Sequence, residues 1–104
     1  MIRWLPKVLR HIQLLVADGK VLITVKARLE MATIGFGLDD QDVCDILAEL
    51  TPSDFSARLV SAHTGEWLYV FKPTLAETTI YLKLVLRDEC VVISFHEDDD
   101  TGVS

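Results

Sequence analysis

The sequence lacks the long apolar run of a membrane protein, since no hydrophobic stretch approaches the roughly 18 residues that a spanning helix needs. The first twenty residues, MIRWLPKVLRHIQLLVADGK, are apolar, but Lys7, Arg10, His11 and Gln13 interrupt them and no small-residue cleavage site follows. We therefore expect an amphipathic helix here rather than a signal sequence, and a cytoplasmic protein that does not contact a membrane.

Cysteine and histidine are scarce and widely spaced. Cys44 and Cys90 lie far apart, and His11, His63 and His96 form no HxxxH pattern. Such spacing indicates neither a disulfide framework nor a metal site. We expect buried free thiols, no metal and no cofactor.

Basic residues are absent from one acidic segment. Residues 39–54 contain six Asp or Glu and no Lys or Arg, whereas residues 1–38 contain six Lys or Arg and two acids. The net charge of −6 argues by itself against a nucleic-acid partner. Because the acids gather in this segment and in the tail from Glu97, the rest of the chain is neutral to basic. The acidic segment fits a solvated helix face, with a surface that mimics nucleic acid as the alternative.

Apolar residues are plentiful enough to form the core of one domain, since they make up half of the 104 residues. They recur at helical spacing from Leu5 to Val16, and Asp18-Gly19 supplies a stop. A second helix is expected from a Thr24 cap to about Thr33, with one side formed by Val25, Leu29 and Ala32. Asp39 and Asp40 open a third helix, where their charges complement the helix dipole.

After Thr51-Pro52-Ser53-Asp54 the hydrophobic period changes to two, which is typical of strands. We expect four strands, over residues 55–62, 66–72, 78–86 and 90–96. The layout predicts an α+β domain at residues 1–96, with three N-terminal helices packed on a C-terminal four-stranded antiparallel sheet. Residues 97–104 are expected to form an acidic, disordered tail.

The last two strands predict a clean division between the faces of the sheet. If the hairpin turns at Asp88-Glu89, Tyr81 lies opposite His96 and Lys83 opposite Ser94. The other face then carries only apolar pairs, Leu82–Phe95, Leu84–Ile93 and Leu86–Val91. A three-residue loop would shift the register by one, and the clean division argues against it. A turn at Ala76-Glu77 would likewise place Lys72 opposite Tyr81.

These pairings predict a polar cluster formed by Lys72, Tyr81, Lys83, Ser94 and His96, which Arg58 joins if it faces the same way. Cationic side chains stabilise charge on a phosphodiester, and histidine serves as acid or base near neutral pH. RNA brings its own nucleophile, the 2′-hydroxyl group, so its cleavage needs no metal. An exposed antiparallel face is also rich in such residues without any function.

Several segments, in order and spacing, resemble the MqsR toxins of bacterial type II toxin–antitoxin modules: VADGKVLITVKARLEMATIGFGLDDQDVCDILAEL, LTPSDF, WLYVFKP, IYLKLVL and VVISFHE. The resemblance covers about Ile12 to Glu97. It implies a RelE-like fold, metal-independent cleavage of mRNA and neutralisation by a cognate antitoxin, and it leaves association with the ribosome open. Tyr81 and Lys83 match the Tyr-x-Lys of the family.

The combined expectation is an endoribonuclease in which His96, Tyr81 and Lys83 are catalytic and Lys72 and Arg58 bind phosphate. The chain departs from the family at Ala57, where a lysine is expected, at Leu68, where a glutamine is expected, and at His96, where a lysine is expected. These changes leave an alternative, a catalytically inactive member of the fold that binds an antitoxin or regulator.

Overall fold

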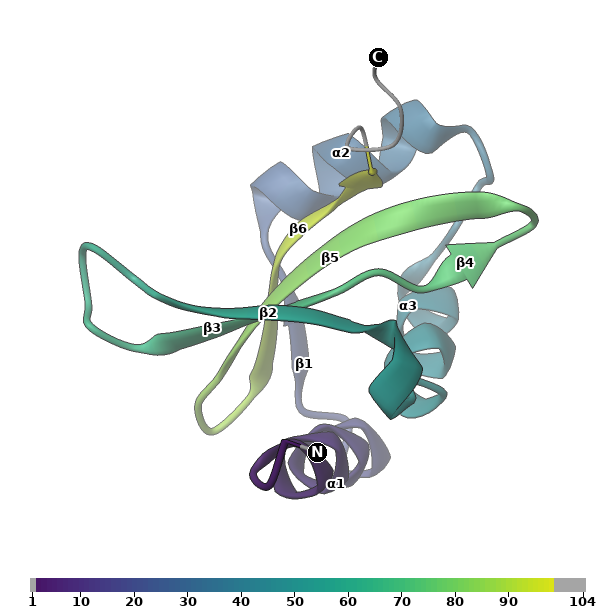
Figure 1. Cartoon of the computed structure of the whole chain (residues 1–104). Helices are drawn as coiled ribbons and strands as arrows, with labels where there is room; N and C mark the ends of the chain where they lie inside the picture. The colour runs from purple at the N-terminus through teal and green to yellow at the C-terminus, as the bar shows by residue number, and fades with distance from the viewer. Residues whose placement is uncertain (1, 99–104) are drawn as a thin grey trace, which may run out of the picture.

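The computed structural model describes residues 2–98, and Figure 1 shows how its elements follow one another. In chain order they are α1 (Leu5–Ala17), β1 (Val21–Ile23), α2 (Val25–Ile34), α3 (Asp40–Ala48), the 3₁₀ turn η1 (Pro52–Asp54), β2 (Phe55–Val60), β3 (Trp67–Phe71), β4 (Thr74–Leu75), β5 (Thr78–Leu86) and β6 (Cys90–Glu97). The α+β class with three helices before the main strands is confirmed.

The expected helix boundaries are confirmed by their caps. The Thr24 side chain accepts a hydrogen bond from the Ala27 N–H at the start of α2, and Asp39 forms a capping box with Asp42 at the start of α3. Asp40, in the first turn of α3, receives two hydrogen bonds from Arg28 at 2.7 and 2.9 Å. These hydrogen bonds lower the pKa of the Asp40 carboxyl. The acidic segment therefore has a structural role at a helix N-terminus.

The sheet is larger than expected and is not purely antiparallel. Its strands run in the order β1-β6-β5-β3-β2, and the short β4 pairs with β5. The first strand, β1, pairs in parallel with β6, where Val21 lies opposite Cys90 and Ile23 opposite Val92. The expectation of four antiparallel strands is thus corrected to a six-stranded mixed sheet. A three-residue strand is too short for side-chain alternation to reveal it.

A bulge in β6 divides the predicted hairpin register into two parts. Near the open end, Tyr81 pairs with His96 and Lys83 with Ser94, as expected. Nearer the turn, the pairs are Leu84–Val92, Val85–Val91 and Leu86–Cys90 instead. The loop has three residues, 87–89, and Ile93 is the extra residue of the bulge, which restores the register beyond it. The residues of this half that face the helix-covered core are therefore Cys90 and Val92, whereas Val91 is buried on the opposite face with Val85 and Ile93 is half-buried.

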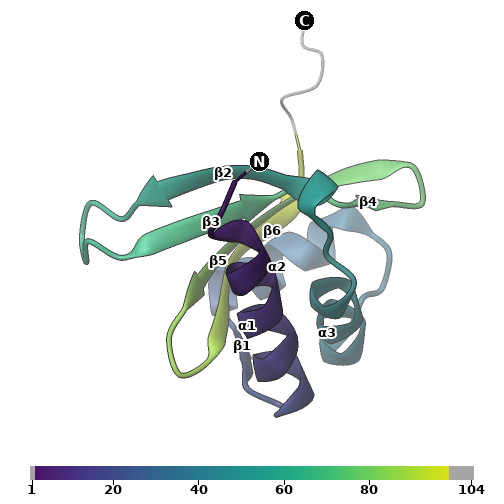
Figure 2. The same cartoon turned by 60° about the horizontal axis from the view of Figure 1, so that its bottom comes forward.

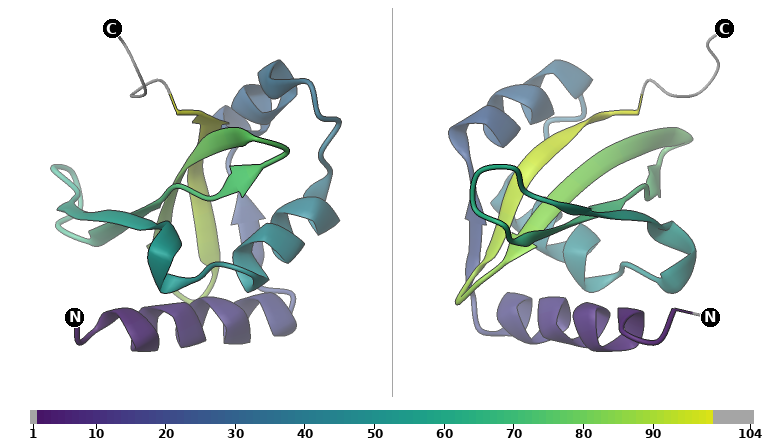
Figure 3. Two further views of the ribbon diagram at one scale, coloured as in Figure 1. Left: turned by 45° about the vertical axis from the view of Figure 1, so that its right-hand side comes forward. Right: turned by 60° about the vertical axis from the view of Figure 1, so that its left-hand side comes forward.

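Two helices cover one face of the sheet. In Figure 2, α1 and α3 lie below the strands on the same side of the sheet. Helix α2 packs along β6. Figure 3 shows the strong twist of β5 and β6. The core between these layers contains Ile12, Leu47, Phe71, Leu82 and Phe95, each at most 1% exposed. On α2 the buried residues are Ala27 and Met31, so the side that carries Val25 and Leu29 faces solvent. Within residues 2–98, no helix combines the length and apolarity needed to cross a bilayer.

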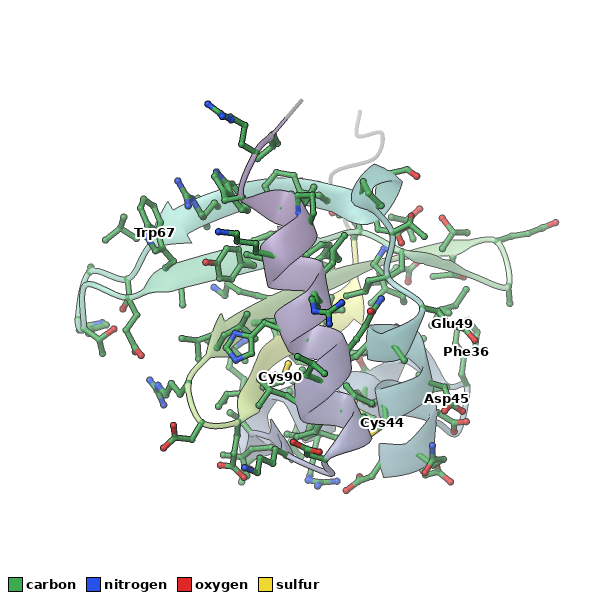
Figure 4. All side chains as sticks on the ribbon, turned by 90° about the horizontal axis from the view of Figure 1, so that it is seen from below. Phe36, Cys44, Asp45, Glu49, Trp67 and Cys90 are labelled. Carbon is green, nitrogen blue, oxygen red and sulfur yellow. The ribbon has the colours of Figure 1, made fainter. Side chains whose placement is uncertain are left out.

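Both cysteines are free thiols, and their environments differ. Cys90 is completely buried behind α1 in the view of Figure 4, and burial raises the pKa of its thiol to about 12. Cys44, on α3, is only half-buried. Since the thiolate is the reactive form, the buried Cys90 is inert at neutral pH.

Candidate active site

The polar cluster lies on the sheet face opposite α1 and α3. Leu82 and Phe95 pair with each other and are fully buried in the core. Because neighbouring side chains on a strand point to opposite faces, the pairs Tyr81–His96 and Lys83–Ser94 point away from α1 and α3. Tyr81, Lys83 and His96 are half-buried. The antiparallel pairing of β5 and β6 therefore brings together four of the residues that the sequence pattern indicated.

The rings of Tyr81 and His96 are stacked in parallel. Their centroids are 4.9 Å apart and their planes differ by 8°. The Nδ1 atom of His96 lies 2.8 Å from the carbonyl oxygen of Glu97. Since a carbonyl oxygen only accepts, Nδ1 carries a proton, and neutral His96 keeps its lone pair on Nε2. The stack thus holds an imidazole with Nε2 as its basic nitrogen beside a phenol.

The Ser94 side chain is the buried member of the polar cluster. It is 2% exposed, and its Oγ accepts a hydrogen bond of 2.9 Å from the Nζ of Lys26 on α2. The same ammonium group lies 2.9 Å from the Oε2 of Glu30. Helix α2 therefore contributes a second lysine beside the strand pair that carries Lys83.

Glu30 ties α2 to the edge of β6. Its Oε1 accepts a hydrogen bond of 3.0 Å from the Phe95 N–H. Burial alone would raise the pKa of this carboxyl, but the hydrogen bonds from Lys26 and Phe95 and the charges of Lys26 and His96 outweigh it, so the pKa is lowered. Glu30 is consequently ionised at neutral pH, next to the strand end that carries His96.

Lys72 reaches the same face from the end of β3. Its backbone N–H donates to the carbonyl oxygen of Asp54, so Lys72 lies just beyond the ladder between β3 and β5, which ends with Phe71 opposite Leu82. The expected pairing of Lys72 with Tyr81 is therefore not formed. The Lys72 Nζ lies 3.4 Å from the Asp98 Oδ2. Asp98 follows His96 by two residues, so this contact places Lys72 beside the cluster.

Arg58 lies on the other face. It pairs with Tyr69 on the side covered by α1, and its guanidinium carbon is 4.0 Å from the ring centroid of Trp4 and 3.8 Å from that of Trp67. Figure 4 looks onto this helix-covered face and shows Trp67 at the edge of the sheet. The structure thus separates Arg58 from the polar cluster and places it between two indole rings, where cation–π attraction holds it.

Comparison with known proteins shows the family of the chain. Residues 6–97 match the family described as "Motility quorum-sensing regulator, toxin of MqsA". The chain belongs to the MqsR toxin family. A curated relative, the mRNA interferase toxin MqsR of Escherichia coli (strain K12), is 33% identical over 91 residues, which cover 86% of this chain and 90% of the relative. The resemblance that the sequence motifs indicated is confirmed.

Two positions at which the resemblance predicts other residues in this MqsR-family chain, Ala57 and Leu68, lie on the face of the polar cluster. Ala57 pairs with Val70, which in turn pairs with Lys83, so Ala57 is two strands from Lys83, a separation of about 10 Å. Leu68 pairs with Val85 on the same face. On this face of the sheet, β2 and β3 therefore present apolar residues at positions 57 and 68.

Three residues near the site, Lys26, Glu30 and Asp98, were not anticipated from the MqsR-family sequence. Lys26 and Glu30 stand four residues apart on α2, a spacing that usually indicates a surface ion pair. Their contact with β6 depends on how α2 docks, which periodicity does not reveal. Asp98 lies in the segment expected to form the tail, but its N–H donates to the Thr79 carbonyl at 2.9 Å. The tail residues 99–104 lie outside the described residues.

Proposed function

We propose that this chain is an endoribonuclease that cleaves mRNA without a metal, the toxin of a toxin–antitoxin pair with a RelE-like fold. The observation that carries the proposal is the half-buried Tyr81–His96 stack beside Lys83, on the sheet face away from α1 and α3. The name of the Escherichia coli relative, an mRNA interferase toxin, supports the substrate. Since mRNA is the substrate, the site of action is the cytoplasm.

The chemistry requires proton transfer at two oxygens and positive charge at the phosphorus. His96 Nε2 removes the proton of the RNA 2′-hydroxyl group, whose oxygen attacks phosphorus while the bond to the 5′-oxygen breaks. The leaving oxygen takes a proton, for which Tyr81 is the neighbouring donor. Lys83 and Lys72 offset the charge that develops on the phosphoryl oxygens. The products are a 2′,3′-cyclic phosphate and a 5′-hydroxyl end, so no water is consumed in this step.

The family description names the toxin of MqsA, and from it we propose that a cognate antitoxin neutralises this chain. An antitoxin that covers the polar cluster would block RNA directly. The cluster lies on the face away from α1 and α3, so such a partner need not disturb the core.

We expect cleavage to depend on the 2′-hydroxyl group at the cut site and not on metal. A substrate RNA incubated with the protein in EDTA should yield 2′,3′-cyclic phosphate ends, and the same RNA with one 2′-deoxy nucleotide at that site should stay intact. The products are read by denaturing gel and mass spectrometry, with and without ribosomes. Cleavage of the 2′-deoxy RNA, or a strict need for metal, would contradict the mechanism.

An inactive binding module is the second candidate, favoured by apolar Ala57 and Leu68 on the cluster face and by the contact between Lys72 and Asp98. Expression of the chain without any partner separates the two functions. Growth arrest and transcript loss support the nuclease. Unimpaired growth, together with no cleavage of any RNA in vitro, supports the binding module.

Arg58 offers a test of the division between the two faces. We expect Arg58→Ala to lower the free energy of unfolding by roughly 1–2 kcal/mol, because it removes two cation–π contacts worth about 0.5–1 kcal/mol each. Cleavage by the folded variant should stay near the wild-type rate. The measurements are urea unfolding and initial cleavage rates below the unfolding transition.

Arg58→Lys is the matched variant, since it keeps the charge but loses the planar stacking group. We expect it to be destabilised like Arg58→Ala. A large loss of RNA binding by the alanine variant but not by the lysine variant would instead assign Arg58 to phosphate binding.

A further inference from the structure

Helix α2 is docked along the part of β6 that no strand covers. β1 pairs with β6 only as far as Ile23 opposite Val92. The Thr24 N–H and its hydroxyl group both donate to the Val92 carbonyl, at 3.2 and 3.0 Å, so α2 begins where β1 ends. Six residues further along the chain, the Glu30 carboxylate accepts a hydrogen bond from the Phe95 N–H. Helix α2 therefore lies along the edge of β6 beyond the end of β1, in the direction of His96.

This docking brings the Lys26 ammonium group to the polar cluster. Its Nζ is 2.9 Å from the Ser94 Oγ, and Ser94 pairs with Lys83 and lies two residues before His96. Residues two apart on a strand are separated by about 7 Å. Lys26 and Lys83 thus flank Ser94 from α2 and from β5, close to the stacked rings.

The Lys26 side chain is nevertheless open to solvent, with 60% of its surface exposed. An ammonium group has three N–H donors, and the contacts among residues 2–98 use two of them, to Ser94 and Glu30. Exposed ion pairs contribute little to folding stability. The two hydrogen bonds position the ammonium group beside Ser94, and its third N–H donor is left for a ligand.

We infer that Lys26 is a further substrate-binding residue, which binds an RNA phosphate beside Ser94, with Glu30 as the residue that positions its ammonium group. The inference rests on the proposed nuclease function. On the β2 side of the same face, Ala57 offers no cation, whereas Lys26 adds one on the α2 side. An RNA strand would then cross β5 and β6 with its phosphates between Lys83 and Lys26.

The test is the salt dependence of binding to a 2′-O-methyl RNA, which the protein cannot cleave. For single strands the slope of log K against log salt is about −0.7 for each phosphate neutralised. Lys26→Gln should reduce the magnitude of the slope by roughly 0.7, whereas Lys26→Arg should retain it. With cleavable RNA, Lys26→Gln should raise KM more than it lowers kcat.

Lys20→Gln is the matched control, because Lys20 is an exposed lysine at the opposite end of β6, where its carbonyl oxygen accepts from the Cys90 N–H. It should leave the slope unchanged. A wild-type slope for Lys26→Gln together with a reduced slope for Lys83→Gln would overturn the inference and leave the nuclease standing. If the wild-type protein neither binds nor cleaves RNA, the proposed function and this inference both fail.

Discussion

Replacement of His96 by alanine is expected to lower the rate of RNA cleavage by roughly 10²–10⁴-fold, the usual contribution of a positioned proton-transfer group. His96 is the imidazole stacked on Tyr81, with its Nδ1 at the Glu97 carbonyl and Nε2 left as the basic atom. RNA binding should change little, because Lys26, Lys72 and Lys83 remain. The measurement is the single-turnover cleavage rate beside the Kd for an uncleavable RNA.

Two variants show whether the loss is specific to proton transfer. His63→Ala changes an exposed histidine in the turn between β2 and β3 and should cleave at the wild-type rate. His96→Lys puts a cation at the site but removes the imidazole nitrogen that accepts the proton, so only a small part of the rate should return. Full activity of His96→Lys would mean that His96 acts through its charge, and full activity of His96→Ala would remove it from the mechanism.

Replacement of Phe95 by alanine is expected to lower the free energy of unfolding by about 3–5 kcal/mol, as for other buried aromatic residues. Phe95 is fully buried in the core, and its N–H donates the hydrogen bond by which Glu30 connects α2 to the sheet. Domains of this size are stable by only about 5–15 kcal/mol. Urea unfolding followed by circular dichroism should show a much lower midpoint, and activity should be lost on mild heating.

Ile93→Ala is the comparison that makes the result informative. Ile93 lies two residues before Phe95 and would share the core face in an unbroken strand, but the bulge leaves it only half-buried. We expect Ile93→Ala to lower the free energy of unfolding clearly less than Phe95→Ala does. An equal decrease in the free energy of unfolding for both variants would mean that β6 has no bulge and that Ile93 reaches the core.

Local signals accounted for the parts of the fold that were predicted correctly. The Thr24 and Asp39 caps depend on residues within one turn of a helix, and the pairing of β3 with β5 follows from a tight turn at Ala76 and Glu77, where φ is positive at both residues. The bulge at Ile93 and the parallel β1 were missed because each depends on contacts between distant segments. A bulge reverses side-chain alternation without any mark in composition.

The same division applies to the site. Tyr81, Lys83, Ser94 and His96 could be assigned to one face because they lie on the correct side of the bulge, where strict alternation holds. The face of Arg58 depends on an irregularity between Phe55 and Ala57 and on Trp4, which reaches it from the start of α1. Lys26 enters the site only through the docking of a helix whose own sequence resembles an ordinary solvated one.

The bond between Thr24 and β6 joins residues 68 positions apart. Contacts of such long range form late in folding, because the intervening chain must first be brought together. The residues proposed for catalysis and RNA binding come from α2, β5 and β6, and only this closure assembles them. A chain in which β6 has not yet docked therefore lacks the proposed nuclease face, so we expect toxicity only once folding is complete.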